Sequence, residues 1–153
     1  MRPVAVILVA LLLLSAGCDR LFWTGLSPAS TPDRPVFLFG GQPDLSGDAW
    51  VYGVEVSGRP RHENQWHSFW KVEKDSVVRY VVVHEVPYGS VPEHMSEAAV
   101  PESLPSGYVY SMSAGFHGLG RPTYFEITAD IAGARSISEL SEDEFARMVH
   151  DTL

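Results

Sequence analysis

The sequence predicts an α+β domain, with a mainly antiparallel sheet of about five strands and one C-terminal amphipathic helix packed on it. Beyond residue 36, most of the chain consists of short segments that are apolar or alternate between apolar and polar residues, as strands do. Only the C-terminus spaces its apolar residues as a helix does. A β-sandwich or small barrel with the helix as a plug is the alternative.

Six segments have the β-branched and aromatic composition of strands. They are residues 36–39, 49–56, 66–73, 77–86, 108–112 and 123–131. Residues 77–86 are apolar on both faces, which predicts a central strand covered on both sides. Residues 74–76 are polar and predict a hairpin turn between this strand and the one before it.

Residues 87–106 form a connection of about twenty residues, which is longer than most loops. Four prolines stiffen it, and Pro92 favours a short helix over residues 93–99. The connection is either a surface excursion or a lid or partner-binding loop, and the sequence leaves both open.

The C-terminal segment predicts a helix that begins after Ser141. Ser141 and Glu144 have the spacing of a capping box. Four apolar residues follow at helical spacing, and they are Phe145, Met148, Val149 and Leu153. A helix packed on a sheet by this stripe is the expected arrangement.

The N-terminus has the three parts of an export signal. Arg2 supplies a positive charge, residues 4–14 are an apolar run of about eleven residues, and residues 15–17 are small. The run is too short for a bilayer core of ~30 Å, which needs ~20 helical residues. Cys18 follows directly.

Residues 14–18, with the sequence Leu-Ser-Ala-Gly-Cys, resemble the lipobox of bacterial lipoproteins. The resemblance implies that residues 1–17 are removed as a signal peptide and that Cys18 carries two or three acyl chains, enough for stable anchoring. The chain is thus expected at the cell membrane, facing the periplasm or the cell exterior. Asp19 favours the inner membrane in a Gram-negative cell.

Residues 18–35 are rich in Pro, Ser and Thr and predict a flexible tether between the lipid and a single globular domain at residues 36–153. Leu21, Phe22 and Trp23 are the exception, and they suit the membrane interface beside the lipid. A chain that begins at about Asp33 is accordingly expected to fold by itself.

Charge and cysteine content exclude several classes. The formal net charge is −8, and loss of Arg2 with the signal changes it to −9, which argues against nucleic acid as a partner. Cys18 is the single cysteine, so the domain has no intrachain disulfide and depends on its core for stability.

Aromatic and histidine residues between positions 62 and 70 are the candidate binding residues. Trp66 and Trp70 belong to an aromatic-rich pair of segments that is expected mostly in the core but could line a groove. His62 and His67 are the best short-range metal ligands, yet their spacing suits neither face of a strand or helix. No stoichiometric zinc or copper is expected, and no cofactor. Residues 115–121 are Gly-rich and predict a turn rather than an anion cradle.

No catalytic motif is recognisable in the chain, neither a Gly-x-Ser-x-Gly elbow nor a His-Glu-x-x-His zinc motif. The leading hypothesis is a membrane-anchored envelope lipoprotein that acts as a non-enzymatic binding or assembly module, with an envelope protein as a possible partner. The alternative is an envelope hydrolase or metal-dependent enzyme.

Overall fold

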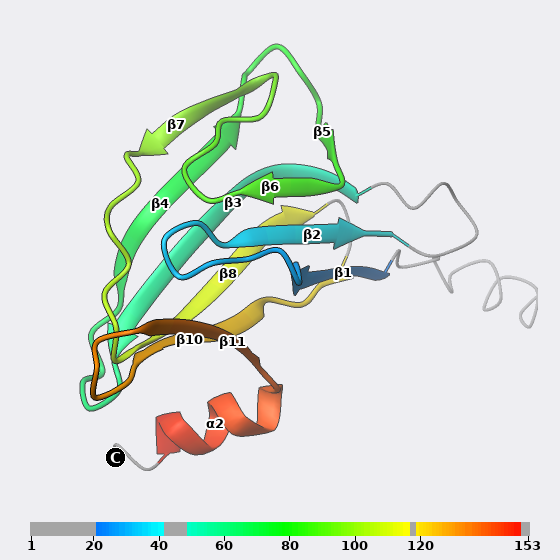
Figure 1. Ribbon diagram of the computed structural model, residues 1–153. Coiled ribbons are helices and arrows are strands. Elements are labelled where there is room, and N and C mark those ends of the chain that lie inside the picture. Colours follow the sequence, from blue (N-terminus) through cyan, green and yellow to red (C-terminus); the bar gives the residue numbers. More distant parts are fainter. Residues whose placement is uncertain (1–20, 42–48, 117–118, 151–153) are drawn as a thin grey trace, which may run out of the picture.

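Two β-sheets packed face to face form the domain (Figure 1). The computed structural model describes residues 21–41, 49–116 and 119–150. In this part of the chain there are eleven strands and one helix, so the prediction of an α+β fold with about five strands is wrong. The helix lies outside the two sheets (Figure 1), so it is not a plug either.

The large sheet has the order β11-β10-β8-β3-β4-β7, and β5 pairs with the first residues of β3. Its strands are β3 (Ala49–Pro60), β4 (His67–Lys74), β5 (Val81–Val83), β7 (Met95–Ala99), β8 (Tyr108–Phe116), β10 (Thr123–Ala129) and β11 (Arg135–Leu140). All neighbours are antiparallel. The long strand β3 lies at the centre, which is why it carries an almost continuous apolar inner face.

The small sheet has the order β6-β2-β1-β9. Its strands are β1 (Leu21–Leu26), β2 (Val36–Gly40), β6 (Glu85–Pro87) and β9 (Leu119–Gly120). β1 is antiparallel to β2 and parallel to β9. The small sheet covers the inner face of the large sheet across its middle strands (Figure 1).

Aromatic and β-branched side chains fill the space between the sheets. The largest fully buried aromatic side chains are Phe37, Trp70, Tyr110 and Phe125, and the unbranched Met112 is buried with them. Both Phe69 and Trp70 are buried although they are adjacent, because the β3–β4 register shifts between Val56 and Ser57 and leaves Phe69 as an extra residue. Such a bulge turns two successive side chains toward one face.

Residues 21–35, which the sequence predicts to be tether, form a β-hairpin that belongs to the domain. Phe22 is only 5% exposed and stacks on Phe116 with ring centroids 5.0 Å apart. The connection between β1 and β2 is held by an ion pair between Asp33 and Arg135. The tether prediction is therefore wrong for this part, while residues 1–20, with the predicted signal and Cys18, lie outside the described residues.

Residues 77–86 do not form one central strand. Within this segment the chain changes sheets, because β5 pairs with β3 in the large sheet whereas β6 pairs with β2 in the small one. Val77 is 86% exposed and Val82 is 45% exposed, so this segment is not a strand covered on both faces. The predicted hairpin with the preceding strand is also absent from the described pairings, since β4 pairs with β3 and β7.

The long connection at residues 87–106 contains one strand that pairs with the large sheet. Residues 95–99 form β7 against β4 rather than the predicted helix. The Tyr88 side chain links the connection to β4, since the single proton of its Oη is shared between the carbonyl oxygens of Glu102 at 2.7 Å and Phe69 at 3.0 Å. Pairing with an available sheet edge outweighs the local helical preference here.

Helix α2 (Glu142–His150) begins where the capping box predicts it to begin. Ser141 N donates to Glu144 Oε2 at 2.8 Å, and Glu144 N donates to Ser141 Oγ at 3.3 Å. The hydrogen bond from the Ser141 hydroxyl lowers the pKa of Glu144. Phe145 stacks on Tyr124 with centroids 3.8 Å apart, on the outer face of the large sheet.

Phe145→Ala is expected to destabilise the domain by ~1.5–2.5 kcal/mol, about half the cost of removing a fully buried ring, because Phe145 is only half-buried. Ser141→Ala is expected to cost ~1 kcal/mol through the lost cap. Urea unfolding of both variants measures the two effects. A loss above ~4 kcal/mol for Phe145→Ala would show that the helix is part of the core.

Two buried tyrosines predict a loss of stability in alkali. Burial raises the pKa of Tyr88 to about 12 and also raises the pKa of Tyr110, whose Oη donates to the Pro105 carbonyl at 2.6 Å. The unfolded chain ionises tyrosine near pH ~10, so the stabilisation is complete below that pH and is lost as the pH rises toward the folded-state values. Tyrosinate absorbance is expected to reach its full amplitude only as circular dichroism reports unfolding. Six tyrosines titrating together in the folded protein would contradict this.

Candidate ligand-binding groove

The outer face of the large sheet is divided into a covered and an uncovered part. Helix α2 covers the side formed by β10 and β11 (Figure 1). Over β3, β4 and β8 the face is open and forms a groove with a volume of about 430 Å³. The groove is lined by Tyr52, Gly53, Val54, Glu55, Lys71, Glu73, Lys74, Ser113 and Gly115.

Small residues make the floor of this groove. Gly53 on β3 lies opposite Gly115 on β8, and Glu55 lies opposite Ser113. A Cβ at Gly53 would lie 2.8 Å from the carbonyl oxygen of Val72, so the strands approach too closely there for a side chain. The Tyr52 side chain lies beside Gly115 and forms one wall, where the β3–β8 register shifts.

Charged side chains of both signs form the opposite wall. Lys71 on β4 faces Glu55 on β3, and its Nζ lies 2.6 Å from Glu73 Oε1. The hydrogen bond and charge of Glu73 raise the pKa of Lys71, so the amine stays protonated and is unsuited to act as a base. Lys74 Nζ is held by the Val78 carbonyl at 2.7 Å. The groove therefore offers fixed charges and hydrogen-bonding groups to a polar ligand.

The predicted aromatic binding residues do not lie in this groove. Trp70 is fully buried between the sheets and packs against Tyr88, so no ligand can reach its ring. Trp66 is 40% exposed but lies beside helix α2, with its ring 6.0 Å from that of Phe145. Of the five aromatic residues in the two segments, only Phe69 and Trp70 are buried, whereas Trp50 and Tyr52 are partly exposed, so the expectation that most of them lie in the core is wrong.

The two predicted histidines are exposed and are not gathered into a metal site. His67 Nε2 lies 3.2 Å from Glu102 Oε1, whereas His62 lies in the turn after β3. Within residues 21–41, 49–116 and 119–150, no three His, Cys, Asp or Glu side chains are grouped so that they could hold a metal ion. The absence of zinc and copper stays a prediction, to be checked by elemental analysis after dialysis, with a His62→Ala/His67→Ala double variant as control.

Arg59 is a buried cation that no sequence pattern singles out. It is 1% exposed, and its Nη1 donates to the Glu63 carbonyl and, at 3.1 Å, to Asn64 Oδ1. Its guanidinium also lies 5.8 Å from the centre of the Trp66 ring. These contacts hold the turn between β3 and β4 against the sheet, which is a structural role.

The class of protein that these features define is a two-sheet β domain with one polar sheet face left open. Comparison with family models, with characterised proteins and with solved structures gives no match to this chain. In the described part of the chain, no helix has the length and apolar character needed to cross a bilayer.

Proposed function

We propose that the chain is a lipid-anchored protein of the bacterial envelope that binds a polar ligand in the open groove without catalysing a reaction. The anchor rests on residues 14–18, which resemble a lipobox. The groove carries the binding part of the proposal, because it combines an aromatic wall, a floor of small residues and charges of both signs.

The charge pattern favours a ligand with both positive and negative groups, such as a peptide segment. Lys71 can bind a carboxylate, and Glu55 and Glu73 can bind an amine, while the flat floor leaves room for an extended chain. Mutual pairing of Lys71 and Glu73 keeps these side chains in place before the ligand arrives. Preorganisation of this kind lowers the entropic cost of binding.

A photo-crosslinking amino acid at Ser113 tests the proposal, because Ser113 is exposed and lines the groove. The variant is irradiated in intact envelopes, and the adduct is identified by mass spectrometry. We expect an adduct from position 113. Position 131 is the control, because Ile131 is fully exposed at the turn between β10 and β11 and does not line the groove, so we expect no adduct from it.

A matched pair of charge reversals supplies the control. Lys71→Glu replaces the cation between Glu55 and Glu73 by a third carboxylate and is expected to abolish the adduct. Arg147→Glu changes the net charge equally on the exposed surface of α2 and is expected to keep the adduct. Equal adduct formation in both variants, or adducts from both labelled positions, would contradict a ligand site in the groove.

A further inference from the structure

The start of β1 lies very close in the chain to the predicted lipid anchor. β1 begins at Leu21, three residues after Cys18. An extended chain spans at most ~3.3–3.6 Å per residue, so the Cα atoms of these two residues are at most ~11 Å apart. With acyl chains on Cys18 in the bilayer, this end of the small sheet is held at the membrane surface.

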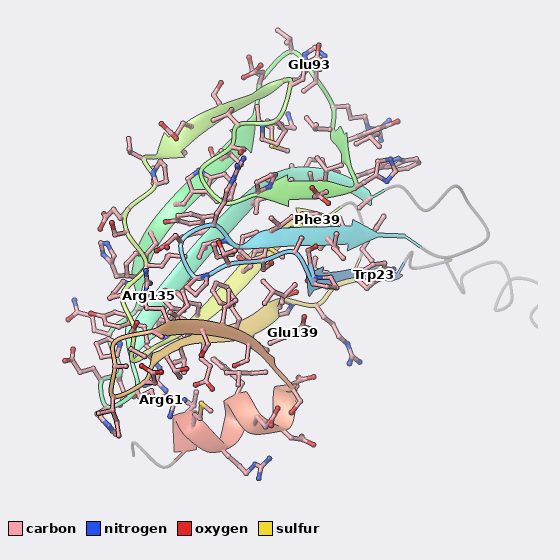
Figure 2. The ribbon with its side chains drawn as sticks, viewed as in Figure 1. Trp23, Phe39, Arg61, Glu93, Arg135 and Glu139 are labelled. Carbon is pink, nitrogen blue, oxygen red and sulfur yellow. The ribbon has the colours of Figure 1, made fainter. Side chains whose placement is uncertain are left out.

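Trp23 is the apolar side chain that points outward at this end of the sheet (Figure 2). It is 52% exposed, whereas its neighbour Phe22 points into the core. Trp23 lies opposite Gly40 on β2, and a Cβ at Gly40 would overlap the indole ring. The ring is therefore seated on the backbone of β2 and held in a half-exposed position. Tryptophan is enriched at membrane–water interfaces.

A hollow with a volume of about 280 Å³ lies beside Trp23, and an exposed cation is among its lining residues. This cation is Arg121, whose side chain is 87% exposed and lies 3.8 Å from Glu142. Thr24 Oγ1 donates to the Arg121 carbonyl at 2.8 Å and so fixes its backbone against β1. A guanidinium group binds phosphate with two parallel hydrogen bonds.

We infer that this end of the small sheet docks on the phospholipid surface, with Trp23 in the headgroup layer and Arg121 on lipid phosphates. The inference rests on the lipid anchor of the proposed function. Docking gives the domain a fixed orientation, since the residues from Leu21 on, which the sequence predicts to be tether, instead belong to the β1–β2 hairpin. Because the net charge of the chain is negative, nonspecific electrostatic attraction to anionic lipid does not drive this docking.

Fluorescence quenching by brominated lipid tests the inference. Full-length protein, with acylation of Cys18 verified by mass spectrometry, is reconstituted into phosphatidylcholine vesicles with or without bromine on the acyl chains. We expect bromine to reduce the emission of the wild-type protein. Trp23→Phe is expected to abolish this reduction while it keeps an aromatic ring over Gly40. Circular dichroism checks that the variant is folded.

Trp66→Phe is the matched control, because Trp66 is also half-exposed but lies beside α2. It is expected to leave the quenching unchanged. Arg121→Glu puts a further carboxylate beside Trp23 and is expected to reduce the quenching. Protein that is acylated and floats with the vesicles, yet shows no quenching assignable to Trp23, would overturn the docking inference alone. Absence of acylation or of flotation would instead overturn the anchor itself.

Discussion

A variant that lacks residues 18–32 will lose its folded state or keep only a small part of its stability. The deletion removes β1, which lies between β2 and β9 and is hydrogen-bonded to both. It also removes Phe22 from the core and leaves the inner face of β8 without the ring that covers Phe116. Circular dichroism and urea unfolding of the purified variant measure the effect.

Phe22 and Trp23 form a matched pair for this prediction, because they are adjacent on β1 but differ in burial. Phe22→Ala is expected to cost ~3–5 kcal/mol, the usual loss for a buried phenylalanine. Trp23→Ala removes a half-exposed ring and is expected to cost only ~1 kcal/mol. Since domains are stable by ~5–15 kcal/mol, the first change alone removes a large fraction of the total. Equal, small losses in both variants, with a stable deletion variant, would restore the tether interpretation.

Cys18→Ser is expected to abolish acylation and leave the unprocessed precursor. The thiol is the group to which the diacylglyceryl unit is attached in the lipoproteins whose lipobox residues 14–18 resemble. A serine hydroxyl at this position is not a substitute, because it lacks the nucleophilic thiolate. Mass spectrometry of the N-terminal fragment and fractionation of the cells measure the result.

Ser15→Leu supplies the control for this change, since leucine is the commonest residue at that position of a lipobox. This variant is expected to be acylated and processed at least as completely as the wild type. A Cys18→Ser protein that still matures and fractionates with membranes like the wild type would contradict the lipoprotein prediction, and with it the anchor on which the docking inference rests.

The C-terminal helix was predictable because its signals are local. A capping box at Ser141 and Glu144 determines where the helix starts, and both hydrogen bonds of that box are formed. Phe145 of the predicted apolar stripe packs on the sheet through Tyr124, while Leu153 lies outside the described residues. The degree of burial of Phe145 was not readable, because it depends on how much of the sheet the helix covers.

The number of strands was not predictable for a different reason. Residues 21–26 include Phe, Trp and Thr, which favour strands, but they lie beside Pro- and Ser-rich sequence and are therefore predicted to be tether. Residues 95–99 contain no β-branched or aromatic residue and residues 135–140 are largely polar, and both become strands because they pair with open edges of the large sheet. Strand formation depends on a partner that is distant in sequence, so local composition is a weak guide to it.

The candidate groove could not be seen in the sequence at all. Tyr52, Glu55, Lys71 and Ser113 come from three strands and meet only through the registers of β3 with β4 and β8. Sequence analysis instead favoured Trp66 and Trp70, because aromatic residues are conspicuous in a sequence whether they are buried or exposed. Trp70 pairs with the buried Val56 and shares its face of β4 with the buried Val72, so it lies in the core and not at the surface.

The sequence by itself determined the features that a few neighbouring residues specify: the helix with its cap and the apolar segments that supply the core. It also carries the prediction of a lipid on Cys18. Only the tertiary structure decided that residues 21–35 are part of the domain, that the chain passes from one sheet to the other between β5 and β6, and that Trp23 stays outside while Phe22 is buried. Helix caps depend on contacts three or four residues apart. Strand pairing joins residues up to about a hundred positions apart, as in β1 and β9. Which segments pair therefore depends on all the strands that can reach the same sheet edge, and not on local sequence.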